Sequence, residues 1–293
     1  MSFNLFTEKF KLLLHKNQDL IVNTLSNIFT MRLIGNKTHG DLAEIGIAEF
    51  INQFMYDYRS VHVGKDLFRA KEHEEDIQIY NELDEKDNFS ISLKAYGDGP
   101  LQLSTDSESL FFRFLSDLHI VDLSDGEKIS EVVKNKIFQN FNQINVLPLI
   151  YNEKDKKCNI MTFDYERALE EVARICFINK NQKFNHKTGT IEIGKGRTHP
   201  IFLFLNKNNQ YIFEVRYGDV AANALQRGLW THTKNALPYF NSLTGGWLDY
   251  HHNKTLIALF SLALNATESG HKKANKLLQQ DIEELKANAR IAD

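Results

Sequence analysis

An acid and a lysine lie at matching points of two predicted neighbouring strands. Asp76 comes directly before a run that alternates apolar and polar residues, 77–80, and Lys94 lies within a second such run, 89–96. The charged stretch 81–88 between the runs is typical of a hairpin connection. Because successive side chains of a strand point to opposite faces, we expect the apolar residues of both runs in the core. Asp76 and Lys94 are then expected side by side on the other face.

These two residue types can together hydrolyse a phosphodiester. Carboxylate oxygens bind a hard divalent cation such as Mg²⁺, which keeps water ligands and neutralises charge on the phosphate. A nearby ammonium orients or deprotonates the attacking water and meets the developing negative charge. The sequence therefore predicts Asp76 and Lys94 as catalytic residues and Mg²⁺ as the cofactor. The alternative is an ordinary cross-strand ion pair on a solvated sheet face.

A predicted helix before this hairpin carries two further acids. Residues 42–58 have apolar residues at helical spacing, and the helix includes Glu44 and Glu49. Either glutamate can supply a second carboxylate to the metal, and the alternative for each is a solvated position on the helix surface.

This arrangement resembles the PD-(D/E)xK nuclease core of type II restriction endonucleases, with Glu44 on a helix, Asp76 at the head of a strand and residues 92–94 on the neighbouring strand. Two positions depart from the family pattern. Glu75 rather than proline precedes Asp76, and Ser92 stands where the family usually places a second acidic residue. The second carboxylate of a metal site would then come from the preceding helix.

The resemblance covers roughly residues 40–105. It implies an α+β fold with a mixed or antiparallel central sheet flanked by helices, as in restriction endonucleases. It also implies Mg²⁺-dependent, sequence-specific cleavage of double-stranded DNA, and a homodimer because two strands must be cut. In this core, Asp76 and Glu44 would bind the metal together with the main-chain carbonyl of Leu93, and Lys94 would position or activate water. The residues of this predicted catalytic site are Glu44, Asp76, Ser92, Leu93 and Lys94.

Residues suited to contact DNA follow the predicted hairpin and recur in the C-terminal half. Basic side chains bind phosphates, and arginine also reads guanine in the major groove. For most of these residues the alternative is a solvated loop anchored by core aromatics. Arg216 with Glu214 also forms a second acid and cation pair, but arginine cannot act as a base. The predicted DNA contacts are Gln102, Lys195, Arg197, His199, Arg216, Arg227, His232 and Lys234.

Periodicity predicts two regions packed as one body: a nuclease core with N-terminal helices, 1–150, and a C-terminal DNA-contact and helical region, 151–293. Three strand-like runs within 188–219 predict a C-terminal β-meander. The other stretches with helical spacing are 3–31, 107–118, 126–141, 163–178 and 255–292.

Composition excludes some classes of protein without choosing a function. The net charge of -3 is close to neutral, so affinity for a polyanion must come from local basic clusters. Two cysteines, expected as reduced packing residues, and the lack of an N-terminal signal or a membrane-length apolar run predict a cytoplasmic protein without a membrane partner. The alternative functions are a non-catalytic DNA-binding or regulatory protein and a structure-specific DNA repair nuclease.

Overall fold

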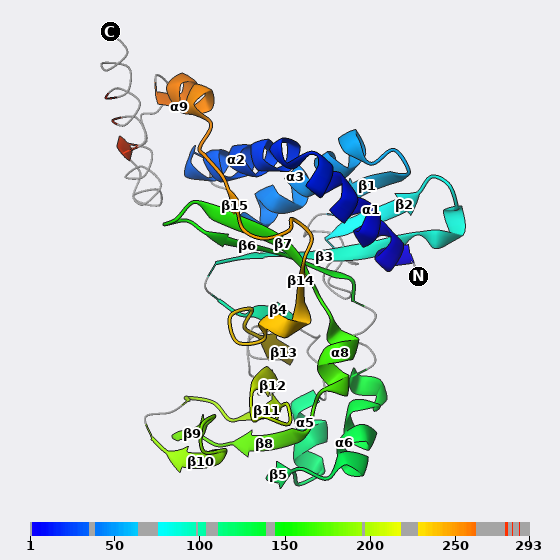
Figure 1. The fold of residues 1–293 in the computed structure, drawn as a ribbon, viewed down its shortest axis with the longest axis vertical. Coiled ribbons are helices and arrows are strands. Elements are labelled where there is room, and N and C mark those ends of the chain that lie inside the picture. Colours follow the sequence, from blue (N-terminus) through cyan, green and yellow to red (C-terminus); the bar gives the residue numbers. More distant parts are fainter. Residues whose placement is uncertain are drawn as a thin grey trace.

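The described part of the computed structural model contains two large sheets, which lie one above the other in Figure 1, and a separate two-stranded sheet formed by residues 182–185 and 190–193. The described residues are 2–34, 39–63, 76–97, 99–103, 111–138, 144–194, 197–217, 228–261, 279–280, 283 and 287.

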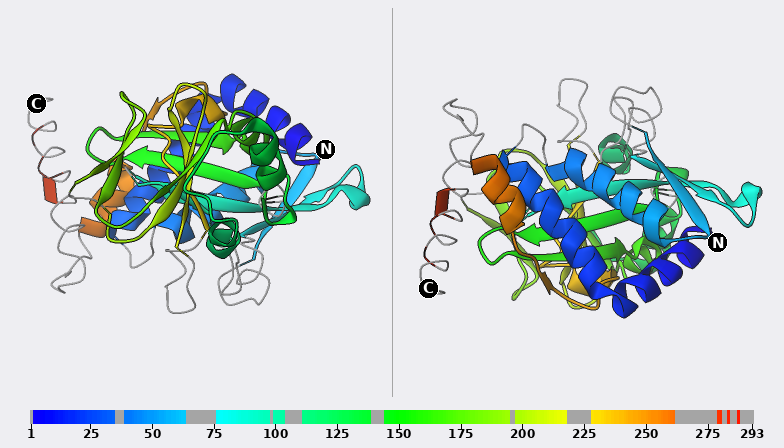
Figure 2. Two further views of the ribbon diagram at one scale, coloured as in Figure 1. Left: turned by 90° about the horizontal axis from the view of Figure 1, so that it is seen from below. Right: turned by 90° about the horizontal axis from the view of Figure 1, so that it is seen from above.

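The upper body in Figure 1 is a mixed sheet with three N-terminal helices on one face. Its strands run in the order β1-β2-β3-β6-β7-β14, and β15 also pairs with β7. Only the pairing of β3 with β6 is parallel among these described strands. Seen from above, α1, α2 and α3 lie across the sheet (Figure 2). The expected α+β class with a mixed sheet flanked by helices is therefore confirmed.

The elements of this body are α1 (Ser2–Lys16), α2 (Gln18–Ile34), α3 (His39–Phe54), β1 (Tyr58–His62), β2 (Ile77–Asn81), β3 (Phe89–Tyr96), β6 (Val146–Asn152), β7 (Lys157–Phe163), β14 (Phe240–Ser242), β15 (Leu248–Asp249) and α9 (Lys254–Ser261).

Alternation along β2 and β3 decides which side chains enter the core beneath the helices. Ile77, Ile79, Ile91 and Leu93 are all at most 3% exposed and belong to the cluster that includes the apolar residues of α1, α2 and α3. The two strands pair with Ile77 opposite Ile91, and the connection between them contains the 3-10 turn Glu85–Asp87. The predicted hairpin and its buried face are thus confirmed.

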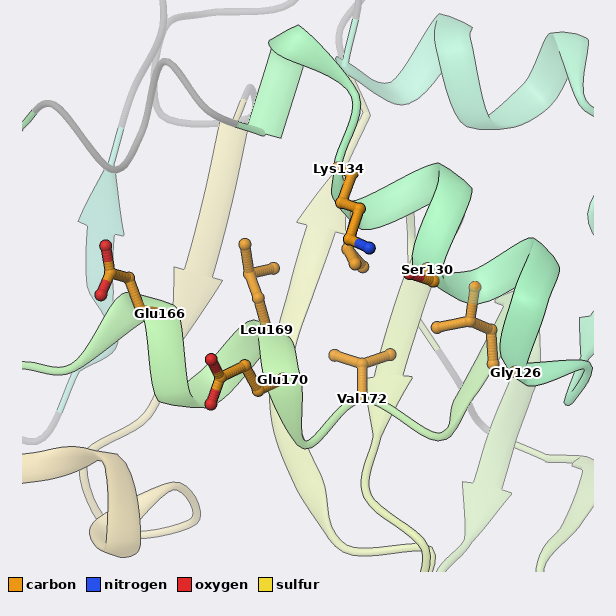
Figure 3. A pocket seen from close by; sticks show the side chains of 9 residues that line it. Gly126, Ser130, Lys134, Glu166, Leu169, Glu170 and Val172 are labelled. Carbon is orange, nitrogen blue, oxygen red and sulfur yellow. The ribbon is translucent and has the colours of Figure 1, made fainter.

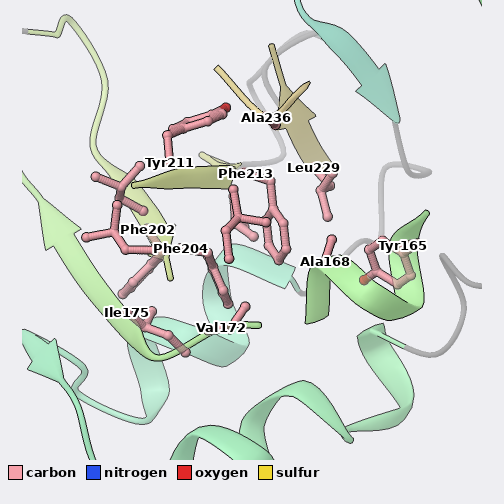
Figure 4. Close-up of a cluster of buried hydrophobic side chains, with 14 of the residues drawn as sticks. Tyr165, Ala168, Val172, Ile175, Phe202, Phe204, Tyr211, Phe213, Leu229 and Ala236 are labelled. Carbon is pink, nitrogen blue, oxygen red and sulfur yellow. The ribbon is translucent and has the colours of Figure 1, made fainter. Parts of the chain in front are cut away.

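The lower body in Figure 1, called the second body below, is built around an antiparallel sheet in the order β4-β13-β12-β11-β8-β5. Its core contains several aromatic residues: Phe204 stacks on Phe213, and Phe213 lies next to Tyr165 of α8 (Figure 4). The elements are β4 (Leu101–Leu103), α5 (Phe111–Asp117), β5 (Asp122–Leu123), α6 (Gly126–Val133), α8 (Tyr165–Glu170), β8 (Arg174–Ile178), β9 (Gln182–Asn185), β10 (Thr190–Ile193), β11 (Ile201–Leu205), β12 (Tyr211–Arg216), β13 (Gly228–Thr231) and the 3-10 turn Leu237–Tyr239.

The chain passes from one sheet to the other and back. β4, α5, β5 and α6 precede the return to β6 and β7, and the elements from α8 to β13 complete the second sheet before β14 rejoins the first. Val146, Ile150 and Met161 of β6 and β7 belong to the core of the second body. The Tyr96 hydroxyl at the end of β3 also lies 2.7 Å from the Thr233 hydroxyl. One face of the first sheet therefore packs on the helices and the other on the second body.

Two of the predicted elements are wrong. The stretch 163–178 is not one helix: α8 ends at Glu170, and Arg174–Ile178 forms β8 between β5 and β11. Its residues Ile175, Cys176 and Ile178 are buried by strand neighbours on both sides, and a short apolar run does not reveal this from periodicity. In the expected meander, β11 and β12 pair with each other, but the first run, β10, pairs with β9.

The expectations for the cysteines and for membrane segments can also be compared with the structure. Cys158 and Cys176 are free and buried, as expected, and burial raises the pKa of each thiol to about 12. No helix in the described part of the chain is long and apolar enough to cross a membrane.

The close crossing of α2 and α3 yields a first testable prediction. A Cβ added at Gly46 of α3 would lie 2.7 Å from Cγ1 of Ile28, a buried residue of α2, so one side chain must shift. Overpacking of this kind costs typically about 1–3 kcal/mol, which offsets the roughly 1 kcal/mol that alanine gains over glycine in a helix. Gly46→Ala is therefore expected to lower the urea midpoint, and adding Ile28→Val should restore part of the loss.

Gly126→Ala is the control for this prediction. No atom lies within 4 Å of a Cβ added at Gly126, at the start of α6. This substitution should leave the midpoint unchanged or raise it slightly. A Gly46→Ala protein as stable as the Gly126→Ala protein would contradict the proposed contact.

Candidate active site

Asp76 lies at the head of β2 with its carboxylate directed at β3. Its Oδ2 accepts hydrogen bonds from the Leu93 N–H at 2.7 Å and from the Ser92 hydroxyl at 3.2 Å. In the main chain, the Asp76 N–H donates to the Ile91 carbonyl at 3.0 Å, and the Asp76 carbonyl accepts from the Val63 N–H at 2.9 Å. The carboxylate thus takes the place of a strand partner for Leu93 and is fixed between β1 and β3.

Lys94 follows on β3 and reaches the same carboxylate. Its Nζ lies 3.8 Å from Asp76 Oδ2, and the side chains of Lys94 and Asp76 are 26% and 17% exposed. The structure therefore brings together the acid and the lysine that the strand register predicts to be neighbours. Their contact is too long for a strong hydrogen bond, so Lys94 acts on Asp76 mainly through its charge.

Burial dominates the electrostatics of Asp76. Desolvation raises the pKa of its carboxyl above the ordinary value of 3.8, although the charge of Lys94, the Leu93 N–H, the Ser92 hydroxyl and the charge of His62 all act to lower it. Ionisation of Asp76 therefore destabilises the folded protein. Carboxyl groups with a pKa perturbed in this way are typical of functional sites.

Asp76→Asn is expected to raise the thermal midpoint of the metal-free protein by about 2 °C or more at pH 8. Burial raises the folded-state pKa of Asp76, so the protonated carboxyl stabilises the folded protein. This stabilisation is complete below pH 3.8, the ordinary pKa, and is lost as the pH rises through the folded-state pKa. Asparagine keeps an oxygen that accepts from Leu93 and carries no charge. The advantage of the variant should therefore shrink as the pH falls toward 4, which a series of thermal melts in EDTA would measure.

Asp122→Asn is a control for which the opposite change in thermal midpoint is expected. Two hydrogen bonds from Arg174, at 2.8 and 2.6 Å, lower the pKa of Asp122, so its stabilising effect is present at neutral pH and lost in acid. This variant should melt lower than the wild type at pH 8. If both variants changed the midpoint in the same direction, burial would not be the dominant influence on Asp76.

Ser92 occupies the position at which the resembled family places an acid. The strand pattern predicts it on the face opposite the helices, but it is buried there, with an exposed fraction of 2%. Its hydroxyl donates to Asp76, and its N–H donates to the Asn145 carbonyl at 2.8 Å. Ser92 therefore supports Asp76 and adds no charge to the site.

Glu44 reaches the sheet from α3 and meets a histidine. Its side chain is 7% exposed, and its Oε2 lies 3.0 Å from Nε2 of His62, the last residue of β1. Glu49 on the same helix is exposed. Of the two helix glutamates, the structure therefore places Glu44 next to the sheet and turns Glu49 to the surface.

The donors around Asp76 suit a hard cation that keeps water ligands. No described residue donates a hydrogen bond to the second oxygen of Asp76, Oδ1, since both described hydrogen bonds reach Oδ2. The N–H and C=O of a strand residue point to the same side, so the Leu93 carbonyl lies on the Asp76 side of β3. Among the described residues no group of three or more His, Cys, Asp or Glu side chains is arranged to hold a metal ion. Mg²⁺ characteristically takes one or two carboxylates and several waters, so this oxygen donor set fits it.

The predicted DNA contacts fall into several environments. Arg197 and Arg216 both pair with Glu214: Arg197 Nη1 and Nη2 lie 3.1 and 2.8 Å from its two oxygens, and Arg216 Nε lies 2.5 Å from Oε1. The Arg216 guanidinium also lies 3.4 Å from the centre of the Trp230 ring. Gln102 of β4 pairs opposite Trp230 in the same sheet.

The remaining predicted contacts are peripheral to this ion-pair cluster or outside the described residues. The ring of His199 stacks 5.9 Å from that of Tyr217. Desolvation lowers the pKa of His232, so its ring is neutral at physiological pH. Lys234 is exposed. Lys195 and Arg227 lie outside the residues that the structure describes.

A cavity of about 610 Å³ lies elsewhere, between α6 and α8 (Figure 3). It is lined by apolar residues such as Ile129 and Leu169 and by the charged residues Lys134, Glu166 and Glu170. None of the predicted site residues lines it.

Comparisons of the chain with protein families, curated proteins and solved structures found no match. The candidate site therefore has to be judged on its own geometry. His62 was not among the predicted site residues, because its strand, 58–62, shows alternating burial but no neighbouring motif. Only the contact with Glu44 identifies it.

Proposed function

We propose that the chain is a Mg²⁺-dependent endonuclease that cleaves double-stranded DNA at specific sites, with a core like that of type II restriction endonucleases. The observation that carries the proposal is the Asp76 carboxylate, fixed by the Leu93 N–H and 3.8 Å from the Lys94 ammonium. The helix-borne Glu44 beside β1 adds support, because such a core requires a second carboxylate.

Each residue has a separate task in this proposal. Asp76 would bind Mg²⁺ through Oδ1 together with the Leu93 carbonyl, and Glu44 would contribute the second carboxylate. Bound Mg²⁺ supplies charge neutralisation at the scissile phosphate and lowers the pKa of a water ligand. Lys94, held near the carboxylate, orients the attacking water and stabilises the negative charge that develops on the phosphate. Ser92 holds the Asp76 carboxylate in place.

DNA would be bound by the basic residues of the second body. Arg197 and Arg216 bring two positive charges to one buried carboxylate, so the cluster keeps a net positive charge. Together with Gln102 and the exposed Lys234, these residues are suited to contact phosphates and base edges. We propose a homodimer, since cutting both strands needs two active sites.

The test is incubation of the purified protein with phage and plasmid DNA, in Mg²⁺ and in EDTA, beside the Asp76→Asn variant. Discrete Mg²⁺-dependent bands that the variant does not produce would support a site-specific nuclease. A smear would favour a nonspecific or structure-specific repair nuclease on the same core. Because Asp76→Asn is expected to be more stable than the wild type, its loss of cleavage could not be attributed to unfolding.

A second candidate function is favoured by Ser92. A buried serine where the resembled core has an acid leaves Asp76 as the one strand-borne carboxylate in the described site. This arrangement suits a protein that binds DNA without cutting it. Intact DNA with a mobility shift that is the same in Mg²⁺ and EDTA would support this candidate and contradict the nuclease.

A further inference from the structure

Glu44 is an acid in an environment that normally disfavours acids. It lies on α3 among residues that pack on the sheet, and its side chain is 7% exposed. Removing a carboxylate from water costs several kcal/mol, which an ion pair repays only partly. A leucine or glutamine would be less costly at such a position, so packing alone does not explain the glutamate.

His62 connects Glu44 to the candidate catalytic pair. Its Nε2 lies 3.0 Å from Glu44 Oε2, and it is paired in the sheet with Ile77, the residue after Asp76. The next residue, Val63, donates its N–H to the Asp76 carbonyl at 2.9 Å. The charge of His62 also acts on the Asp76 carboxyl. The Glu44–His62 contact and the Asp76–Lys94 pair are therefore joined through the backbone at the same end of β1 and β2.

We propose that His62 is a positioning residue of a divalent-cation site: its ring N–H holds the Glu44 carboxylate against β1, so that Glu44 and Asp76 bind one ion together. This inference rests on the proposed function and deepens it, because it assigns the second carboxylate that Ser92 does not provide. A histidine fixes a carboxylate better than a flexible side chain, since its planar ring donates from one defined atom.

His62 itself remains partly accessible, with 30% of its side chain exposed, whereas Glu44 is buried. An ion that reaches Glu44 is expected to approach from the side of the sheet end where His62 and Asp76 lie. Partners of this kind, which orient a ligand without binding the metal, typically change metal affinity about 10–100-fold when removed.

The experiment measures Mn²⁺ binding to the full chain, by the loss of the free-ion electron paramagnetic resonance signal, without DNA. His62→Leu should weaken binding about 10-fold or more. His62→Gln, which keeps an N–H donor, should recover most of the affinity. Glu44→Gln should weaken binding at least as much, and combining it with His62→Leu should add little, because His62 acts only through the Glu44 carboxylate.

Arg59→Leu is the matched control on the same strand. Arg59 forms an exposed ion pair with Glu82 at 3.3 Å and has no part in the proposed site, so its loss should leave Mn²⁺ affinity unchanged. Equal Mn²⁺ affinity of the wild type and His62→Leu would overturn the inference. So would a wild type that binds no Mn²⁺, or additive effects in the double variant.

The outcomes distinguish a failure of the proposed cation site from a failure of the proposed nuclease activity. If Mn²⁺ binding depends on His62 but DNA stays intact, the cation site stands and the proposed function fails. If the wild type cuts DNA but His62→Leu binds Mn²⁺ normally, the nuclease stands and the role of His62 fails.

Discussion

Replacing Lys94 with alanine is expected to lower the rate of Mg²⁺-dependent DNA cleavage by at least about 100-fold, the usual effect of losing a group that transfers or orients a proton. The Lys94 ammonium lies 3.8 Å from Asp76 Oδ2 and is the nearest described cation to that carboxylate. Because Lys94 lowers the pKa of Asp76, its removal should also move the acid limb of the residual activity to higher pH. Single-turnover cleavage rates across a pH series would measure both effects.

Lys157→Ala is a closely matched control for this variant. Lys157 also lies on the first sheet, on β7, and its Nζ is 3.8 Å from a carboxylate oxygen of Asp249. The two variants thus break ion pairs of equal length in the same sheet, and only one adjoins Asp76. Equal cleavage by Lys94→Ala and wild type, with DNA affinity in EDTA unchanged, would remove Lys94 from the catalytic centre.

The local part of the candidate site was accessible from the sequence because a hairpin is a local structure. The alternation of Ile77, Ile79, Ile91 and Leu93 fixes the buried face, and the short connection fixes the pairing of β2 with β3. These two constraints are enough to place Asp76 beside Lys94. They require no knowledge of the rest of the chain.

The long-range part of the site was not accessible in this way. His62 meets Glu44 only because β1 lies at the edge of the sheet beneath α3, a packing that no local pattern specifies. Likewise β3 pairs in parallel with β6 after the chain has left for the second body and returned. A parallel neighbour of this kind requires a crossover whose path the sequence does not state.

The burial of Ser92 follows from the same parallel pairing. An alternating pattern assigns Ser92 to the face opposite the helices, and that face would be solvated in an isolated hairpin. In the folded chain this face packs against the second body, and Val146 and Ile150 of the neighbouring strand β6 belong to the core of that body. Ser92 is therefore buried even though its prediction as a residue of that face was correct.

The arginines of the second body have a structural role that their local sequence does not reveal. In the sequence, Arg197 and Arg216 are basic residues near aromatics, which is typical of a DNA-binding surface. In the structure their guanidinium groups meet at Glu214, whose side chain is 2% exposed. The partners are 17 residues apart in one pair and two in the other. The cluster stabilises the fold whatever its role toward DNA.

Glu214→Gln is expected to lower the free energy of unfolding by roughly 3 kcal/mol, the effect of removing one member of a buried ion pair. Glutamine preserves the volume but leaves two adjacent guanidinium groups without a countercharge. It also removes the contact that fixes Arg216 over the Trp230 ring. Because Arg197 and Arg216 are 39% and 29% exposed and can rehydrate, the loss should lie at the lower end of the range for buried pairs. Urea unfolding followed by tryptophan fluorescence would measure it.

Glu82→Gln provides the comparison that isolates burial. Glu82 also pairs with an arginine, Arg59, at 3.3 Å, but both side chains are more than half exposed. Solvent weakens such a pair, so the substitution should cost less than about 1 kcal/mol. The difference between the two variants therefore measures the effect of burying the carboxylate rather than of losing an arginine contact. Equal losses would mean that Glu214 is solvated in solution, and that Arg197 and Arg216 are not held together by it.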